Sequence, residues 1–320
     1  MTTETTTAER AFVEPKRRPY WIQVVIRIIK EKPLGTFGLI VVVLLILAGV
    51  FADFLAPYPM NKINLADTLS PPSLTHWLGT DNLGRDVFSN IIYGARVSMI
   101  IGFTATFASM VVSIIIGALS AQIGGLFDMI MQRFVDAWMC IPGLMILLIM
   151  MSILGKGMPQ MIAAMAIPGG IGGSRMIRSA VLAVKAYPYV EAERAIGCGL
   201  FPLLYRHVLP NIAPLIILAA AMQVGGMIMM ESGLSFLGYG VPPGVPSWGS
   251  MLSQEGRQYM EIAPALAFWP GFVLSIVIFG SNMFGDALRD ILDPRLKGGV
   301  GSYTGPDAKK LKKMKAKTSM

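Results

Sequence analysis

The residue types that could do chemistry in this 320-residue chain gather in one stretch, "YPYVEAERAIGCGLFPLLYRHVLPN", which covers residues 187–211 between two apolar segments. We call this stretch the 187–211 loop. It combines carboxylates, guanidinium groups and an imidazole, carried by Glu191, Glu193, Arg194, Arg206 and His207. Because charge at this density is costly in hydrocarbon, the loop must lie in water, against lipid headgroups or inside a partner protein.

The spacing of the reactive residues argues against catalysis and metal binding. His76 and His207 are far apart, and Cys140 and Cys198 offer no ligand pattern for zinc. The pattern G-x-x-x-x-G-K-[ST] is absent, and the nearest match, "LGKGMP" at 154–159, lacks the spacing and the hydroxyl that would hold magnesium. We therefore expect no catalytic residue, no metal site and no cofactor in this chain, and two unpaired thiols.

Composition places these residues in a polytopic membrane protein of the all-α class. Hydrophobic residues make up 54% of the sequence and charged residues 14%, with a mean hydropathy of +0.60, whereas soluble domains carry roughly 25% charged residues. Segments of about 20 apolar residues can cross a hydrocarbon core of about 30 Å. By this criterion we predict six transmembrane helices, at 34–56, 96–122, 135–155, 158–180, 209–235 and 264–288.

The fourth predicted span is the least regular. The segment "AIPGGIGGSR" at 166–175 places Pro168 and four glycines inside it. Such a break is tolerated in a membrane only where protein or water satisfies the freed backbone groups. We therefore expect this span to be interior and kinked.

Basic residues predict the orientation. Of the 27 Lys and Arg residues, 22 fall in segments on the side of the two termini and 4 in segments on the opposite side. Because cytoplasmic segments are enriched in Lys and Arg, we expect both termini and the 187–211 loop in the cytoplasm. We interpret the Lys-rich C-terminal end as attracted to the lipid bilayer and expect no nucleic-acid partner. The predicted domains are a cytoplasmic tail at 1–33, a first span at 34–56, an extracytoplasmic loop at 57–95, a five-span core at 96–290 and a basic cytoplasmic tail at 291–320.

Local sequence predicts a short helix inside the 187–211 loop. Pro188 suits the first turn of a helix, and Gly197 can adopt the left-handed conformation that ends one about two turns later. Ala192 and Ala195 keep this helix slim enough to enter a groove. Pro210 suits the start of the fifth span. The pattern leaves two interpretations open, a helix docked in a partner protein and an interfacial helix that lies on headgroups.

The same positions resemble the EAA loop of ATP-binding-cassette importer permeases. The motif consists of an E-A pair, a glycine and a closing L-P pair. In this chain the corresponding residues are Glu191, Ala192, Gly197, Leu209 and Pro210. Two residues depart from the family pattern, Glu193 at a usual alanine and His207 at a frequent isoleucine. The resemblance implies a coupling helix, including Ala195, that docks in a cleft of an ATPase subunit.

Three further stretches resemble the C-type subunit of the dipeptide, oligopeptide and nickel permease subfamily. They are "PPSLTHWLGTDNLGRDVFSNIIYGARVS" at 71–98, "ESGLSFLGYGVPPGVPSWGSML" at 231–252 and "DALRDILDPRLKG" at 286–298. The resemblance covers 34–298 and implies a type I ABC importer permease-like fold in the cytoplasmic (inner) membrane. It also implies partners: a second homologous permease, two ATP-binding-cassette ATPases that bind ATP and magnesium, and an extracytoplasmic substrate-binding protein.

The predicted extracytoplasmic segment, which we call the 57–95 loop, contains turn- and cap-forming residues together with charges that keep a surface hydrated. We interpret it as the face that receives the binding protein. A brace that only packs the spans together is the alternative. The residues on which this interpretation depends are Gly79, Thr80, Asp81, Gly84, Arg85 and Asp86.

Glu231 is the one acid at the end of an apolar span, which makes it a candidate pathway residue. It equally suits a cap on the following segment, "SGLSFLG". The resemblance favours peptides as the cargo, with nickel or another small chelated solute as the alternative. A secondary transporter would instead need coupling acids inside several spans and an inverted repeat, which we do not find in the sequence.

Overall fold

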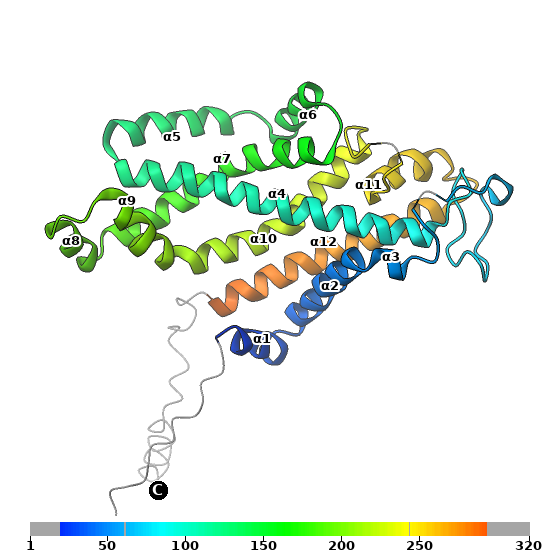
Figure 1. Ribbon diagram of the computed structural model, residues 1–320, viewed down its shortest axis with the longest axis horizontal. Coiled ribbons are helices and arrows are strands. Elements are labelled where there is room, and N and C mark those ends of the chain that lie inside the picture. The colour runs from blue at the N-terminus through cyan, green and yellow to red at the C-terminus, as the bar shows by residue number, and fades with distance from the viewer. Residues whose placement is uncertain (1–19, 61, 243, 293–320) are drawn as a thin grey trace, which may run out of the picture.

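The computed structural model describes residues 20–60, 62–242 and 244–292, which form a bundle of helices joined by loops (Figure 1). The predicted all-α class is confirmed. The helices that carry the architecture are α1 (Tyr20–Glu31), α2 (Pro33–Val50), α4 (Val87–Ile123), α5 (Gly125–Met139), α6 (Gly143–Leu154), α7 (Met158–Lys185), α10 (Leu209–Phe236) and α12 (Ala265–Leu292). Shorter helical pieces are α3 (Ala52–Leu55), η1 (Leu65–Asp67), α8 (Pro188–Ala195), α9 (Leu200–Pro202), η2 (Leu203–Val208), α11 (Trp248–Met251) and η3 (Leu252–Gly256).

The number of spans differs from the prediction. Within the described residues, α2, α4, α10 and α12 are each long and apolar enough to cross a membrane. Helices α5 and α6 pass the same test as a pair but are bent by 90° at their junction, so there are four candidate spans, or five if the pair counts as one. Helix α7 has 28 residues, but its glycines, proline and basic residues make it less apolar. The predicted count of six is therefore not confirmed.

Two predicted boundaries are wrong, and the fourth predicted span is a continuous helix. Helix α4 begins at Val87, so 87–95 is helical, because the carboxylate of Asp86 caps its N-terminus. The predicted span at 135–155 is divided by Pro142, which cannot donate to a helix and starts a new one. Helix α7 continues through 166–175, where we expected an interruption.

Close packing against α4 explains Gly169, Gly170 and Gly173 of α7. The hydroxyl of Ser113 in α4 donates to the backbone carbonyl of Gly170 at 2.9 Å. A Cβ atom added at Gly170 would collide with Val112, and one added at Gly117 would collide with the Ser174 backbone. Small residues let transmembrane helices approach this closely. The segment that appeared to break the fourth span is therefore the surface on which α7 packs against α4.

On the opposite side of the bundle, α2 packs against α12 and α4. Gly38 of α2 lies against the backbone of α12, where an added Cβ would collide. At the end of α2, the guanidinium of Arg96 in α4 donates to both carboxylate oxygens of Asp53, at 3.2 and 2.8 Å. It also donates to the Gly49 carbonyl at 2.9 Å. Arg96 thus fixes one end of α2 to the long helix.

The predicted N-terminal tail at 1–33 is partly structured. Its last residues form α1, whose Val24 and Ile28 are buried against Leu288 and Ile291 of α12. Residues 1–19 and 293–320 lie outside the described part of the chain, and with them nearly all of the predicted tail at 291–320.

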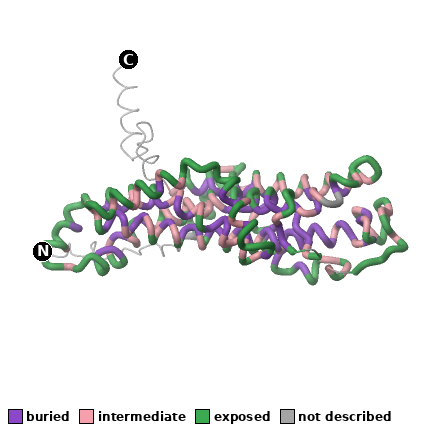
Figure 2. Tube along the Cα trace, turned by 90° about the horizontal axis from the view of Figure 1, so that it is seen from above, coloured by how far each residue is buried: buried purple, intermediate pink, exposed green. Residues whose placement is uncertain are grey.

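Buried residues line the inner sides of the helices along most of the bundle, and exposed residues face outward (Figure 2). One core cluster surrounds Trp248, which is fully buried and donates through Nε1 to the Ile91 carbonyl at 3.0 Å. Another cluster lies at the opposite end of α4, where the 187–211 loop packs. Helix α4 connects these two ends (Figure 1).

Candidate functional site

The 187–211 loop contains the short helix that its sequence predicts. Helix α8 starts with Pro188 in its first turn and ends at Ala195. Gly197 then adopts φ +88°, its N–H bonds to the Arg194 carbonyl at 3.0 Å, and the Cys198 N–H bonds to the Glu193 carbonyl at 3.0 Å. This pair of bonds is the Schellman end of a helix, which requires a left-handed residue at the glycine position.

One side of α8 is held on the bundle. Val190 is fully buried and belongs to a cluster with Ala121 of α4, Val184 of α7 and Leu203. The motif residues Glu191, Ala192, Ala195 and Gly197 are exposed. The helix therefore rests on an apolar contact and presents its motif face away from the protein.

The returning part of the loop holds α8 in place. The Asn211 amide donates to the Tyr189 hydroxyl at 3.0 Å, and Glu193 lies 3.6 Å from the His207 ring. The two residues that depart from the family motif, Glu193 and His207, are therefore in contact with each other. Leu209 is half-buried in the same cluster as Val190, and Pro210 lies in the first turn of α10, as predicted.

Large apolar side chains surround α8 without being covered. Ile196 is 81% exposed and Phe201 69% exposed. Several large apolar side chains left exposed in one loop indicate a contact with another molecule, either a protein or lipid. Sequence reasoning missed these residues, although apolar side chains in a loop expected in water were a usable signal. The set consists of Tyr187, Tyr189, Ile196, Leu200, Phe201 and Tyr205, and we call it the apolar rim.

In the 57–95 loop, most of the predicted contact residues are buried. Gly79, Thr80, Asp81, Gly84 and Asp86 are buried and Arg85 is partly exposed. The Asp81 carboxylate accepts the backbone N–H groups of Leu83 and Arg85 at 2.8 and 2.9 Å and the Arg85 guanidinium at 2.6 Å. These six positions therefore build the loop itself.

Asp86 connects the 57–95 loop to α4. One carboxylate oxygen accepts the Ser89 N–H at 2.8 Å and the Ser89 hydroxyl at 2.7 Å. The other lies 3.0 Å from His76 Nδ1. The helix start is thus bonded to a side chain ten residues earlier in the loop.

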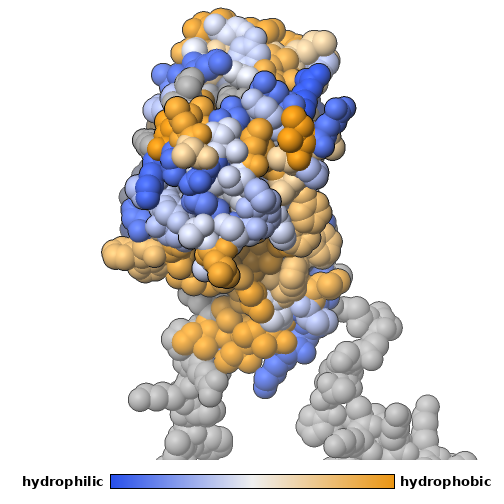
Figure 3. All heavy atoms as spheres, turned by 90° about the vertical axis from the view of Figure 1, so that its right-hand side faces the viewer, coloured by the Kyte–Doolittle hydropathy of each residue, from blue (hydrophilic) through white to orange (hydrophobic). Residues whose placement is uncertain are grey.

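Exposed residues of this loop form a mixed surface at one end of the molecule, where hydrophilic and hydrophobic patches adjoin (Figure 3). Leu74 is 97% exposed and Trp77 59% exposed. A partner that approaches this end would touch these side chains, with the buried residues behind them.

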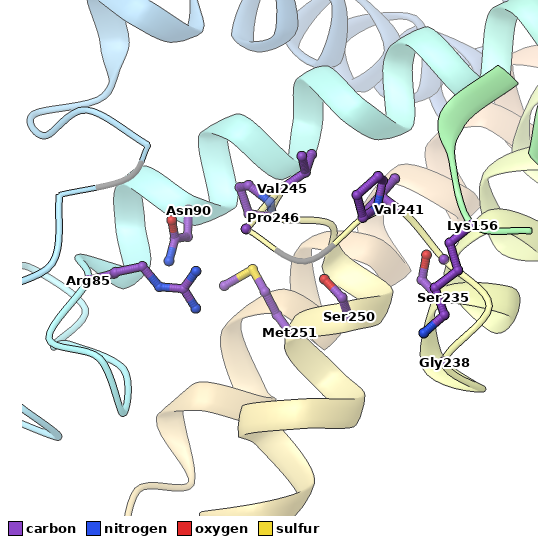
Figure 4. A pocket seen from close by; sticks show the side chains of 13 residues that line it. Arg85, Asn90, Lys156, Ser235, Gly238, Val241, Val245, Pro246, Ser250 and Met251 are labelled. Carbon is purple, nitrogen blue, oxygen red and sulfur yellow. The ribbon is translucent and has the colours of Figure 1, made fainter.

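A polar pocket lies where the 57–95 loop, the turn between α6 and α7, the end of α10 and α11 meet (Figure 4). Its walls include Arg85, Asn90, Lys156, Ser235 and Ser250. The two basic side chains come from different ends of the pocket (Figure 4).

Glu231 lies inside the protein and lines none of this surface. Its side chain is 0% exposed, and its carboxylate accepts the hydroxyls of Ser98 at 3.2 Å, Ser232 at 3.1 Å and Ser235 at 2.8 Å. Helix α10 continues through Glu231 to Phe236, so the residue does not begin a new helix. In this conformation the carboxylate ties α10 to α4.

The sequence matches two family models. Residues 111–298 match the model described as binding-protein-dependent transport system inner membrane component. Residues 20–72 match the model described as N-terminal TM domain of oligopeptide transport permease C.

Similar proteins extend over most of the chain. The oligopeptide transport system permease protein OppC of Bacillus subtilis (strain 168) is 37% identical over 285 residues, which cover 89% of this chain and 93% of that protein. The probable peptide ABC transporter permease protein y4tQ of Sinorhizobium fredii (strain NBRC 101917 / NGR234) is 39% identical over 291 residues, or 91% and 98% of the two chains. A solved structure of the MetNI methionine ABC transporter, titled as inward facing, matches the fold with a TM-score of 0.52 and 18% identity, over 64% of this chain and 97% of that chain.

Proposed function

This chain belongs to the family of binding-protein-dependent transport system inner membrane components, and from that premise we propose how it works as the permease of an importer. Its helices form part of a pathway for peptides, and a second homologous permease completes the pathway. Its 187–211 loop docks in one of two ATPase subunits, which bind ATP and magnesium. Its 57–95 loop receives a substrate-binding protein outside the cell.

The proposed cargo follows the names of the relatives. The Bacillus protein is named for oligopeptides and the Sinorhizobium protein for peptides. Because the identity extends over about nine-tenths of each chain, we favour peptides over nickel or another chelated solute. The similarity to an ABC transporter permease over 91% of this chain favours an ATP-driven importer over a secondary transporter.

The observation that carries the docking proposal is the exposure of α8 and its apolar rim. The helix is fixed on the bundle through Val190, while Glu191, Ala192 and Ala195 face outward. Four of the six residues of the apolar rim are Tyr or Phe, which are the residue types enriched at protein interfaces.

The alternative, a helix that lies on lipid headgroups, is less favoured by the same geometry. Interfacial helices bury an apolar face in the membrane and carry Lys and Arg on the polar face. In α8 the buried apolar residue Val190 points into the protein, and the exposed motif face carries Glu191. With Glu191 and Glu193 against Arg194, the helix carries a net negative charge, which anionic lipid does not attract.

We further propose that the protein lies in the cytoplasmic membrane with both termini in the cytoplasm. The 22 to 4 distribution of Lys and Arg supports this orientation. It places the 187–211 loop on the side where ATP is available and the 57–95 loop on the side from which an imported solute arrives.

The test is the binding of the full-length permease to its ATPase subunits. Glu191→Lys reverses a charge near the N-terminus of α8, where the helix dipole favours a carboxylate by about 0.3–2 kcal/mol. We expect weaker ATPase binding and loss of the ATP hydrolysis that a peptide-loaded binding protein stimulates. The measurement is stimulated hydrolysis in reconstituted complexes matched for permease content.

The matched control is Glu31→Lys. Glu31 is exposed at the end of α1, outside the 187–211 loop. We expect this variant to behave as wild type, because the same charge reversal is made away from the docking face. Wild-type stimulation in Glu191→Lys would contradict the docking proposal.

A further inference from the structure

The cytoplasmic end proposed for α4 is bonded to both ends of the segment that carries α8. Lys185, the last residue of α7, precedes this segment, and Leu200, the first residue of α9, follows it. Each of them makes a hydrogen bond to the last turn of α4. These bonds come in addition to the apolar cluster around Val190.

Lys185 caps α4. Its ammonium donates to the carbonyls of Ala121 at 2.6 Å and Gln122 at 3.2 Å. The last carbonyls of a helix lack partners within the helix and carry partial negative charge, so a cation there is favourable. Lys185 lies past the predicted span, and burial, together with the nearby Arg194 of α8, lowers the pKa of its ammonium. These carbonyls therefore hold a partly buried cation next to α8.

Gln122 makes the second bond. Its side chain is 4% exposed, and its Nε2 donates to the Leu200 carbonyl at 3.0 Å. Its Oε1 is buried and has no hydrogen-bond partner among the described residues. A buried oxygen without a partner is costly. The amide of Gln122 thus makes one bond, to Leu200, and its oxygen has no partner among the described residues.

The other end of α4 adjoins the 57–95 loop. Helix α4 has 37 residues and thus a length of about 55 Å at about 1.5 Å per residue. Asp86 caps its start and is bonded to His76 of the 57–95 loop. A single continuous helix therefore connects the two surfaces on which partners are proposed to bind.

We propose that Lys185 and Gln122 are positioning residues that make α4 the element that moves with α8, so that α4 links ATPase docking to the 57–95 loop. This inference rests on the proposed docking of the 187–211 loop. Without the two bonds, movement of α8 would reach α4 through the apolar cluster around Val190, and would reach the rest of the bundle through the chain connections and the contacts of α8 with the returning part of the loop.

The experiment compares coupling in full transport complexes reconstituted with both permeases, the ATPases and the binding protein. Lys185→Met removes the ammonium and keeps the stem, and Gln122→Leu removes the bond at similar volume. We expect each to lower the number of peptides taken up per ATP hydrolysed, because docking of the ATPase would then move α8 without moving α4. Lys185→Arg keeps a cation and should restore most of the ratio.

Lys30→Met is the matched control, since Lys30 is an exposed lysine of α1 on the same proposed side of the membrane. Its ratio should equal that of wild type. Unchanged ratios in Lys185→Met and Gln122→Leu would overturn the inference. If Glu191→Lys still loses stimulation in that case, the docking proposal stands and only the role of α4 fails.

A second measurement applies if the variants do not assemble. In a chain with Cys140 and Cys198 replaced by Ser, and with Lys185 and Gln122 left in place, Ala121→Cys of α4 and Val190→Cys of α8, which belong to one buried cluster, should be joined by a short bifunctional thiol reagent in the assembled complex. Because the contact is proposed to hold throughout the cycle, the yield should be the same without nucleotide and with a non-hydrolysable ATP analogue. A yield that falls when the analogue binds would contradict the inference.

Discussion

At the residue scale, the two loops use acidic residues in opposite ways. Asp81 and Asp86 are buried and satisfy backbone N–H groups in the 57–95 loop. Glu191 is exposed on α8. A carboxylate that accepts several backbone N–H groups fixes a loop conformation, whereas an exposed one near a helix start is free to meet a partner. Substitution of Asp81 or Asp86 should therefore impair binding of a partner by disturbing the conformation of the 57–95 loop, and not by removing a direct contact.

Glu231 gives a residue-scale prediction. In a chain with Cys140 and Cys198 replaced by Ser, a cysteine introduced by Glu231→Cys should resist a membrane-impermeant thiol reagent, because the position is enclosed by serine hydroxyls. A cysteine introduced by Lys156→Cys, at an exposed position at the same end of the bundle, should react readily. The measurement is the rate of labelling in the assembled protein. Equal rates at the two positions would return Glu231 to the role of a vestibule residue.

At the scale of elements, the contact between α4 and α7 depends on glycines at particular turns. Gly170 of α7 faces Val112 and Ser109, whereas an added Cβ at Gly172 would meet open space. Both positions are helical and belong to the same "GGIGG" segment. Gly170 and Gly172 look equivalent in the sequence, and only the contact with α4 distinguishes them.

The corresponding prediction compares Gly170→Ala with Gly172→Ala. We expect Gly170→Ala to lower the free energy of unfolding by about 1–3 kcal/mol, because the added methyl group forces α7 away from α4. Gly172→Ala should be neutral or stabilising by up to about 1 kcal/mol, since alanine is the better helix former. Thermal unfolding of the purified protein in detergent measures the difference. Equal stabilisation by both changes would show that helix propensity and not packing decides the effect, and equal destabilisation would contradict the open space found beside Gly172.

At the scale of the whole molecule, orientation determines which partner can reach which loop. Cys198 is a free cysteine of intermediate exposure in the 187–211 loop. Because the charge distribution puts this loop in the cytoplasm, an impermeant thiol reagent should miss Cys198 in intact cells and label it in inside-out vesicles. Cys140, which is exposed, should be replaced by Ser so that labelling reports on one site.

Docked ATPase subunits can shield Cys198, so the same cells should carry a C-terminal tag tested for protease access. Accessibility of both the thiol and the tag from outside intact cells would invert the orientation and, with it, the assignment of the two loops to their partners.

Sequence alone determined the features that depend on composition and on local backbone chemistry. Apolar content and length predicted a membrane protein of helices, and the motifs at 187–211, 71–98 and 231–252 predicted the permease family. Pro188 and Gly197 predicted both ends of α8 correctly, because a proline at the first turn and a left-handed glycine after the last act through their own dihedral angles.

Only the tertiary structure decided what depends on neighbours distant in sequence. It showed that the "GGIGG" segment packs against α4 and does not break α7, and that Glu231 is enclosed by hydroxyl groups that include Ser98 of α4. It also showed the bonds of Lys185 and Gln122 across 64 and 78 positions of the chain. The sequence carries no periodic or motif signal for such contacts, because they arise from the packing of separate helices against one another.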